Sequence, residues 1–381
     1  MEFRDLKFQY KRLKREIDEA IATVLLESNF IMGRQVSELE KQLASYIGVK
    51  HCITCANGTD ALQLALMAWE VGEGDAVFIP DFTFFATGEV VSLENATPIF
   101  VDVDEKTFNI DPEKLEKKIN KVMREGKLKP RVIITVDLFG CPADYVKIKA
   151  IAKKYDLLLL EDGAQGFGGS IKGKMVCSFG DISTTSFFPA KPLGCYGDGG
   201  AIFTDSDETA DLMKSYRIHG KGEDKYDNVR IGLNSRLDTI QAAILQVKFH
   251  AFKDYELNAV NHIAKRYSDL LEGVVITPSI PEGYFSSWAQ YTIMLPDKEK
   301  RDGLQKYLKE KEIPSNVYYI KPMHCQGAFS DLENKDIEDL EVAKDLCNRV
   351  LSLPIHPYLM DEDVEEVARE VTMYLNGEKR L

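Results

Sequence analysis

The chain has 381 residues, of which 44% are hydrophobic and 29% are charged, a composition typical of a folded globular protein rather than a disordered or membrane-spanning one. A net charge of -13 argues against a nucleic-acid partner held by phosphate neutralisation, and the length predicts two or three domains. The charged N-terminus lacks the apolar core of a secretion signal, so we expect a cytoplasmic protein without a membrane segment. The seven cysteines are scattered and do not suggest a disulfide framework. Cys52 and Cys55 form a C-x-x-C without a second pair at zinc spacing, so we predict no metal site.

Short apolar strands alternate with amphipathic helices through the first two thirds of the chain. This alternation predicts an α/β fold with a mostly parallel seven-stranded sheet that helices cover on both faces. The strands are predicted at residues 51–55, 75–80, 97–103, 131–137, 156–162, 181–187 and 200–204. Helices are predicted between them at residues 61–69, 113–123 and 144–153.

A long helical stretch at residues 235–271 connects this part to a region where strands and helices are predicted at a different spacing. Strands predicted at residues 274–278 and 288–295 alternate there with helices predicted at residues 299–309, 338–346 and 363–375. This pattern indicates a smaller α/β domain. We therefore divide the chain into a large domain at residues 1–245 and a small C-terminal domain at residues 246–381.

Lys191 lies between two prolines and ahead of a glycine-rich run, in the sequence SFFPAKPLGCYGDGGA. Proline fixes its own backbone angle and has no amide donor, so we expect this lysine on a stiff turn outside helices and central strands. A stiff turn aims its side chain well. A surface loop with a solvated lysine accounts for these residues equally well.

Two further segments place polar groups at strand ends. Asp162 ends the apolar run LLLLED, at the carboxyl edge of the sheet where open α/β folds bind ligands. Either a contact with a ligand cation or a turn-capping role accounts for this residue. In CANGTDALQLAL a strand and a glycine turn lead into a helix that opens at Thr59, whose unpaired amides suit a phosphate. Ordinary capping accounts for this segment as well, and it carries neither a dinucleotide fingerprint nor a P-loop.

Lys191, Asp162, Ser186 and the helix start at Thr59 together match the chemistry of pyridoxal phosphate. Its phosphate binds amides and a hydroxyl, its ring nitrogen needs a carboxylate to stay protonated, and its aldehyde reacts with a lysine amine. A protonated ring withdraws electrons from the substrate carbon that loses a proton, and the freed lysine can carry that proton. These roles predict transamination.

The chain resembles the DegT/DnrJ/EryC1/StrS sugar aminotransferases, which are fold-type I pyridoxal-phosphate enzymes. The resemblance covers nearly the whole chain and rests on NGTDAL, DFTFFAT, EDGAQGFGG, SFFPAKPLGCYGDGGAIFT and LNSRLDTIQAAIL. It implies that Lys191 forms the Schiff base, that Asp162 contacts the pyridine nitrogen and that Gln165 contacts the ring 3-hydroxyl. The other cofactor contacts that it implies are the backbone of Gly58 and Thr59 and the hydroxyl of Ser186 at the phosphate, and Phe84, a better match than Phe85, stacked on the ring.

In this family a second subunit completes the active site, so the resemblance implies a homodimer in which Asn234 reaches the partner's phosphate. Arg236 is expected to face the substrate, where a guanidinium suits an anionic sugar or its diphosphate. Tyr319 and His324 match a substrate loop of the relatives, although the usual histidine and proline of that loop are both replaced here.

The motifs look most like those of members that aminate the 3-keto position of UDP-linked 2-acetamido hexuronic acids for surface polysaccharides. The expected amino donor is L-glutamate, which becomes 2-oxoglutarate. The alternative is an aminotransferase for dTDP-linked 3-keto-6-deoxyhexoses or 4-keto sugars. Lys191 excludes the branch that carries histidine there and removes a hydroxyl. A non-catalytic protein would be expected to have lost Lys191 or Asp162, whereas a lyase or decarboxylase stays open on residue chemistry alone.

Overall fold

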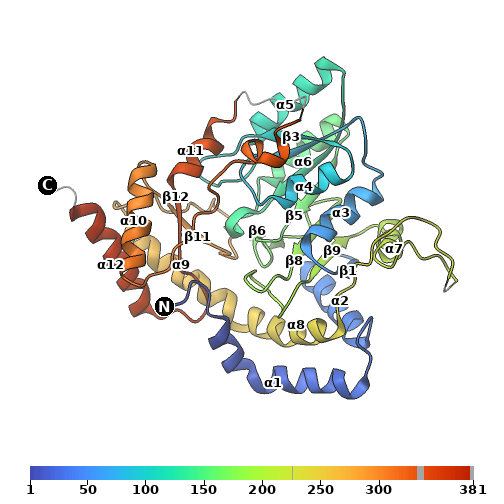
Figure 1. Cartoon of the computed structure of the whole chain (residues 1–381), viewed down its shortest axis with the longest axis horizontal. Helices are drawn as coiled ribbons and strands as arrows, with labels where there is room; N and C mark the ends of the chain where they lie inside the picture. The colour runs from blue at the N-terminus through green and yellow to red at the C-terminus, as the bar shows by residue number, and fades with distance from the viewer. Residues whose placement is uncertain (225, 333–338, 378–381) are drawn as a thin grey trace.

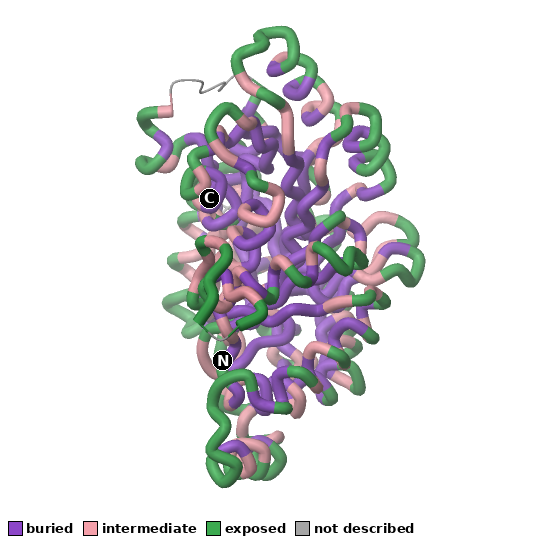
Figure 2. The backbone as a smooth tube through the Cα atoms, turned by 90° about the vertical axis from the view of Figure 1, so that its right-hand side faces the viewer, coloured by how far each residue is buried: buried purple, intermediate pink, exposed green. Residues whose placement is uncertain are grey.

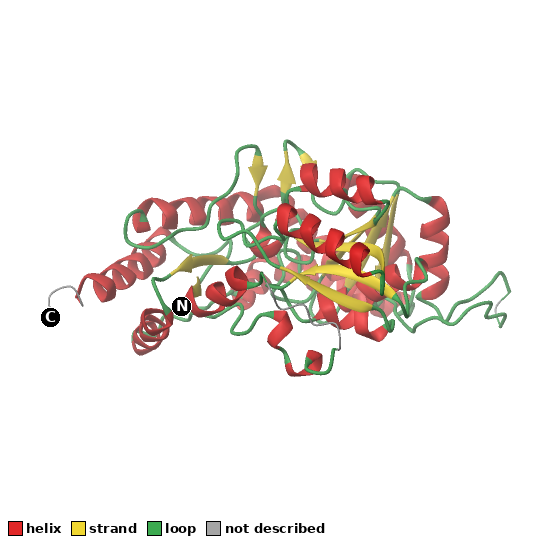
Figure 3. Ribbon diagram, turned by 90° about the horizontal axis from the view of Figure 1, so that it is seen from above, coloured by secondary structure: helices red, strands yellow, loops and turns green. Residues whose placement is uncertain are grey.

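The seven strands predicted in the first two thirds of the chain form one sheet. A computed structural model describes residues 1–224, 226–332 and 339–377, and Figure 3 shows the sheet as yellow strands among red helices. The strand order in this sheet is β1-β9-β8-β5-β4-β2-β3. The five strands from β3 to β8 in that order run parallel, whereas β9 is antiparallel to both of its neighbours, so the prediction of a mostly parallel sheet is confirmed. The strands are β1 (His51–Cys55), β2 (Asp75–Pro80), β3 (Thr97–Val101), β4 (Lys129–Val136), β5 (Leu158–Asp162), β8 (Ile182–Ser186) and β9 (Gly200–Thr204).

Helices cover both faces of this sheet because both faces are apolar. In β2, Val77 and Ile79 pack with helices α3, α4 and α7, while Ala76 and Phe78 pack with α5 and α6 on the opposite face. Such strands have continuous apolar sequences, and Figure 2 shows that the residues at the centre of the molecule are buried. The covering helices are α2 (Arg34–Ile47), α3 (Gly58–Ala68), α4 (Ala86–Leu93), α5 (Pro112–Glu125), α6 (Tyr145–Tyr155) and α7 (Asp207–Tyr216).

A continuous helical stretch leads from the large sheet to the C-terminal region, as predicted. It consists of α8 (Thr239–Ala251), a π-helical turn at Phe252–Glu256 and α9 (Leu257–Leu271) (Figure 1). The domain boundary placed at residue 245 stays a prediction, and it falls inside α8. Leu245 itself packs in the core of the large sheet.

The C-terminal region has an apolar core of its own, built from α9, a two-stranded sheet and two further helices. The strand predicted at residues 274–278 is wrong, because Ile276 makes a single bridge to Met294 and Pro278 has no amide to extend the ladder. Of the helix predicted at residues 338–346, Glu338 lies outside the described residues, Asp339 and Leu340 are not helical, and α11 begins at Glu341. The elements are β11 (Tyr291–Met294), α10 (Lys298–Glu310), α11 (Glu341–Arg349), β12 (Val350–Leu353) and α12 (Asp361–Gly377).

Helix α1 (Leu6–Glu27) was not predicted and runs beside α8 at the bottom of the molecule in Figure 1. Asp5 caps it by accepting a hydrogen bond from the Phe8 amide, and Ile17 and Val24 are fully buried.

Within the described part of the chain, no helix is both long and apolar enough to cross a membrane. The remaining short elements are β6 (Ser170–Ile171), β7 (Lys174–Met175), β10 (Tyr284–Phe285) and the 3-10 turns Leu138–Gly140, Met323–Cys325 and Gly327–Phe329.

Candidate active site

Lys191 lies on the stiff turn that its flanking prolines predict. Its amide donates to the Phe188 carbonyl over 2.8 Å, and the Cys195 amide closes the loop on Phe187 over 2.8 Å. The lysine is half-buried, and burial lowers the pKa of its amine. The carboxylate of Asp162 opposes this effect, so the two side chains lie within electrostatic range of each other.

Asp162 ends β5 at the carboxyl edge of the sheet and is almost fully buried. Its Oδ2 accepts a hydrogen bond from the Thr87 hydroxyl at 3.2 Å, and its Oδ1 accepts one from the Ala164 amide at 3.1 Å. Burial raises the pKa of this carboxyl, while the Ala164 amide, Lys191 and Thr87 lower it. A buried carboxylate held by two donors is well suited to pair with a ligand cation.

Gly58, Thr59 and Ser186 converge at the start of α3. The Asn57 side chain caps the Asp60 amide at 2.7 Å, which leaves the amides of Gly58 and Thr59 as donors of the first helical turn. A Cβ atom on Gly58 would lie 2.7 Å from the Ser186 Cβ, so only glycine allows β8 to approach so closely. Two free amides beside a hydroxyl fit a phosphate, as the sequence predicts. The helix begins at Gly58, one residue before the predicted start.

Gln165 connects this edge of the sheet to Tyr319, which lies far away in the sequence. Its Oε1 accepts from the Phe139 amide at 2.8 Å, and its Nε2 donates to the Tyr319 hydroxyl at 3.1 Å. Burial raises the pKa of the Tyr319 hydroxyl, the hydrogen bond from Gln165 lowers it, and the charge of Asp162 adds to the rise. Asp162, Gln165, Lys191 and Tyr319 therefore form one cluster.

Of the two neighbouring phenylalanines, Phe84 is exposed and Phe85 packs against the core. The Phe84 side chain is 55% exposed just before α4. The Phe85 ring packs on Phe329 with 5.3 Å between ring centroids. This arrangement agrees with the choice of Phe84 as the stacking aromatic.

His324 is held away from solvent by Asp81. Its Nδ1 lies 2.6 Å from the Asp81 Oδ2, its amide donates to the Asp81 Oδ1 at 2.8 Å, and the ring is buried. This pair ties the loop after Tyr319 to the segment that carries Phe84. A substrate contact by His324 stays a prediction, and its Nδ1 is already engaged.

Asn234 and Arg236 are not brought to this cluster by any hydrogen bond of their side chains within the described ranges. Asn234 is exposed and Arg236 is half-buried, while Ser235 between them accepts a hydrogen bond from the Ala56 amide at 3.1 Å. The roles of both residues stay predictions.

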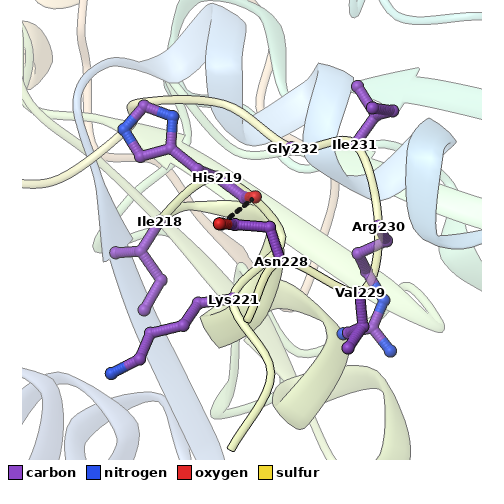
Figure 4. Close-up of a pocket in the computed structure, with 8 residues that line it drawn as sticks. All are labelled: Ile218, His219, Lys221, Asn228, Val229, Arg230, Ile231 and Gly232. Carbon is purple, nitrogen blue, oxygen red and sulfur yellow. Dashed lines mark hydrogen bonds between the residues drawn. The ribbon is translucent and has the colours of Figure 1, made fainter. Parts of the chain in front are cut away.

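The loop between α7 and α8 lines an open hollow of about 840 Å³ that none of the predicted site residues lines (Figure 4). On its wall Asn228 donates to the His219 carbonyl at 2.9 Å, and Arg230 also lines it. Tyr226 and Ile231 project from this loop with 86% and 89% of their surfaces exposed. Among the described residues, no cluster of three or more histidine, cysteine or acidic side chains could hold a metal ion.

Thr87, Asp81 and Arg4 belong to the site but were not identified from the sequence. Thr87 lies on α4 and Thr83 lies in the bend before it, and their hydroxyls are 3.2 Å apart. Arg4 donates to the Lys191 carbonyl across 187 positions of sequence, and no local pattern points to that contact.

Three comparisons with known proteins agree with one another. The DegT/DnrJ/EryC1/StrS aminotransferase family matches residues 11–372. The UDP-2-acetamido-2-deoxy-3-oxo-D-glucuronate aminotransferase of Pseudomonas aeruginosa is 43% identical over 98% of this chain and 99% of the relative. An aminotransferase of the same family from Brucella abortus has a TM-score of 0.94 at 48% identity, covering 98% of this chain and 99% of that chain. NtdA from Bacillus subtilis, solved with bound cofactor PMP, has a TM-score of 0.84 at 29% identity, covering 95% of this chain and 82% of that chain.

Proposed function

We propose that this chain, which belongs to the DegT/DnrJ/EryC1/StrS aminotransferase family, transfers the amino group of L-glutamate to C3 of a UDP-linked 2-acetamido-2-deoxy-3-oxo hexuronic acid. Pyridoxal 5'-phosphate is the cofactor, and Lys191 is the residue that holds it. The product would supply an amino sugar for surface polysaccharides. The observation that carries this proposal is the buried carboxylate of Asp162, which Thr87 and the Ala164 amide hold at the carboxyl edge of the sheet within electrostatic range of the Lys191 amine.

The residues present fit this cofactor. The absence of a Cβ atom on Gly58 lets Ser186 approach the start of α3 closely, and the amides of Gly58 and Thr59 belong to the first turn of that helix. The bound cofactor would supply an electron sink for the carbon that exchanges its proton. The phosphate end would be held by Gly58, Thr59 and Ser186, with Phe84 against the ring.

Asp162 would stabilise positive charge on the ring nitrogen. Its carboxylate is held by Thr87 and the Ala164 amide, so its orientation is set before any ligand binds. Burial strengthens the attraction between this carboxylate and a cation because little water screens it.

Lys191 would move the proton. Its pKa is lowered by burial, so a larger fraction of the amine is unprotonated near neutral pH than for a surface lysine. An unprotonated amine accepts a proton from one carbon and returns it to the next position. Gln165 and Tyr319 are hydrogen-bonded to each other at 3.1 Å, and the charge of Asp162 acts on the Tyr319 hydroxyl, so this pair lies near the carboxylate.

The test has two arms. Borohydride reduction of the cofactor-loaded protein, followed by peptide mass spectrometry, should place the cofactor on Lys191, and Lys191→Gln should abolish this labelling. Lys147→Gln serves as the matched control, because Lys147 lies exposed on α6. A cofactor trapped on another lysine would overturn the site assignment.

The second arm identifies the substrate. A panel of UDP- and dTDP-linked keto sugars is incubated with L-glutamate, and 2-oxoglutarate is measured. We expect the UDP-linked 3-oxo hexuronic acid to give the highest kcat/KM. Turnover of a dTDP-linked 3-keto-6-deoxyhexose alone would replace this substrate by the alternative one, and no 2-oxoglutarate with any sugar would refute transamination. Arg236→Ala should raise KM for the uronic acid if its guanidinium contacts the anionic substrate.

We also infer a homodimer with shared active sites, in which Asn234 reaches the partner's cofactor phosphate. Asn234 is exposed and follows a loop whose Tyr226 and Ile231 are exposed apolar residues, which supports contact with a second copy. Lys191→Ala and Asn234→Ala proteins should each be inactive and should regain activity when mixed, because a hybrid dimer contains one intact site. A mixture that stays inactive, or a monomer by light scattering, would contradict this arrangement.

A further inference from the structure

The backbone carbonyl of Lys191 receives its hydrogen bond from a residue at the start of the chain. Pro189 and Pro192 on either side have no amide, so the turn is poor in donors of its own. The Arg4 Nη2 lies 2.6 Å from the Lys191 carbonyl oxygen and 3.4 Å from the Pro192 carbonyl oxygen. One guanidinium thus holds two successive carbonyls of the turn that carries the reactive amine.

Arg4 precedes the residue that caps α1, and it lies within electrostatic range of a buried carboxylate. The next residue, Asp5, caps α1, so the segment that carries Arg4 is tied to the first turn of that helix. Burial lowers the pKa of the Arg4 guanidinium to about 10. The charge of Glu256 opposes this lowering more than any other group does. Glu256 is buried, and its Oε1 accepts hydrogen bonds from Gln9 Nε2 at 2.8 Å and from the Tyr358 hydroxyl.

A second buried basic group, Lys248, lies within electrostatic range of Arg4, with its Nζ 4.8 Å from the centre of the Tyr196 ring. Burial lowers the pKa of Lys248 to about 8; the charge of Glu256 opposes this lowering, and the charge of Arg4 adds to it. Arg4 and Lys248 are therefore both within range of the Glu256 carboxylate, and the hydrogen bond from Arg4 joins this group of charges to the Lys191 turn.

We propose that Arg4 is a positioning residue for Lys191, which anchors the main chain of the turn so that the amine faces Asp162. The inference rests on the proposed function, because it assigns a role to Arg4 through the cofactor lysine. Its charge has a second consequence. Burial and Arg4 both favour the neutral amine of Lys191, whereas Asp162 favours the charged one.

The ionisable groups around this pair come from several elements. Asp162 on β5 and Arg4 both lie within electrostatic range of the Lys191 amine and shift its pKa in opposite directions. The groups around Arg4 are Glu256 in the π-helical turn, Lys248 on α8, and Tyr358 and His356 in the segment before α12, and Asp5 and Asp363 act on His356 in turn. Removing the Arg4 cation should therefore raise the pKa of the Lys191 amine, and this amine would be protonated over a wider pH range.

The experiment compares Arg4→Gln and Arg4→Lys with Arg12→Gln as the matched control. Arg12 is an exposed arginine of the same N-terminal segment, and its guanidinium lies 4.9 Å from the Tyr255 ring instead of at the turn. The apo-proteins are acylated at a series of pH values with a trace of amine reagent. Mass spectrometry of the Lys191 peptide then gives the midpoint pH of labelling. Circular dichroism establishes that each variant is folded.

We expect Arg4→Gln to move the labelling midpoint of Lys191 to higher pH and to lower kcat by on the order of tenfold or more, since a small displacement of a reacting group is costly. Arg4→Lys keeps a positive charge but offers a single point donor instead of a planar fork, so it should restore the midpoint and only part of kcat. Arg12→Gln should match the wild type in both measurements. Labelling profiles of Arg4→Gln and the wild type that overlay would overturn the inference.

Failure of the inference is distinguishable from failure of the proposed function. Suppose that borohydride traps the cofactor on Lys191 in the wild type, and that the labelling midpoint is the same in Arg4→Gln and the wild type. The inference about Arg4 is then wrong and the site assignment holds. If the cofactor is trapped elsewhere, the site assignment is wrong.

Discussion

Replacing Thr87 by valine should destabilise the apo-protein by an amount that grows as pH rises. Thr87 donates a hydrogen bond of 3.2 Å to the Asp162 Oδ2, and its hydroxyl is also 3.2 Å from that of Thr83. Thr87 is fully buried and Asp162 is almost so, hence water cannot replace the lost donor. Valine keeps the shape of the side chain and removes both hydrogen bonds.

The size of the effect follows from the charge of the acceptor. A hydrogen bond to a charged group contributes about 1.5–3 kcal/mol, and one between neutral groups contributes about 1 kcal/mol. Burial raises the pKa of Asp162, so the folded protein holds this proton more tightly than the unfolded chain and loses stability as pH rises through the folded-state pKa. Thr87 lowers that pKa, so its removal enlarges the loss. We expect Thr87→Val to cost about 3 kcal/mol where Asp162 is ionised and about 1 kcal/mol less where Asp162 is protonated.

The assay is urea unfolding of the apo-protein between pH 4.5 and 8, with the free energy of unfolding extrapolated to water. Thr83→Val is the matched control, because Thr83 bonds Thr87 but makes no hydrogen bond to Asp162, so its cost should not change with pH. An equal cost of Thr87→Val at both ends of the pH range would refute the assigned support of the Asp162 charge by Thr87.

Three further predictions concern the cofactor pocket and its surroundings. Gly58→Ala should weaken cofactor binding by at least tenfold in an absorbance titration, because the new Cβ would lie 2.7 Å from the Ser186 Cβ; an unchanged Kd would contradict the phosphate placement. Phe84→Ala should change the free energy of unfolding of the apo-protein by no more than about 0.5 kcal/mol and should weaken cofactor binding. Phe85→Ala should lower the free energy of unfolding by about 2 kcal/mol or more in urea. Equal costs of the two substitutions would show that Phe84 is a core residue. Burial lowers the pKa of His356 from 6.5 to about 4, so the unfolded chain binds a proton there more tightly than the folded protein does. Acidification from pH 6.5 to 4 should therefore destabilise the wild type by about 3 kcal/mol more than His356→Gln. Parallel pH profiles of stability for the two proteins would refute this.

The cofactor-binding half of the site was predictable because each of its residues lies at a strand end or a helix start. Asp162 follows an apolar run, Lys191 is flanked by prolines, and Gly58 and Thr59 open a helix directly after a strand. Parallel strands bring their carboxyl ends to one edge of a sheet, so these local signals imply a shared location. The resemblance to a family then assigned each residue a role.

The surroundings of the site were less predictable, because long-range contacts decide them. His324 is buried against Asp81, 243 positions earlier in the chain, a contact that no local pattern indicates, and its contact with substrate stays a prediction. Helix α1 was missed, although it covers α8 and places Arg4 against the Lys191 carbonyl. At residues 274–278, where a strand was predicted, Ile276 makes a single bridge to Met294, and Pro278 has no amide to extend the ladder.

By itself, the sequence determined the alternation of strands and helices, the stiff turn under Lys191 and the acid at the end of β5, since apolar periodicity, proline geometry and strand ends are local properties. The tertiary structure alone decided which of two adjacent phenylalanines stays exposed, which hydroxyl supports the Asp162 carboxylate and which cation lies behind the lysine. The physical reason is that hydrogen bonding and burial depend on groups brought together by packing, and their separation along the chain carries no trace of that proximity.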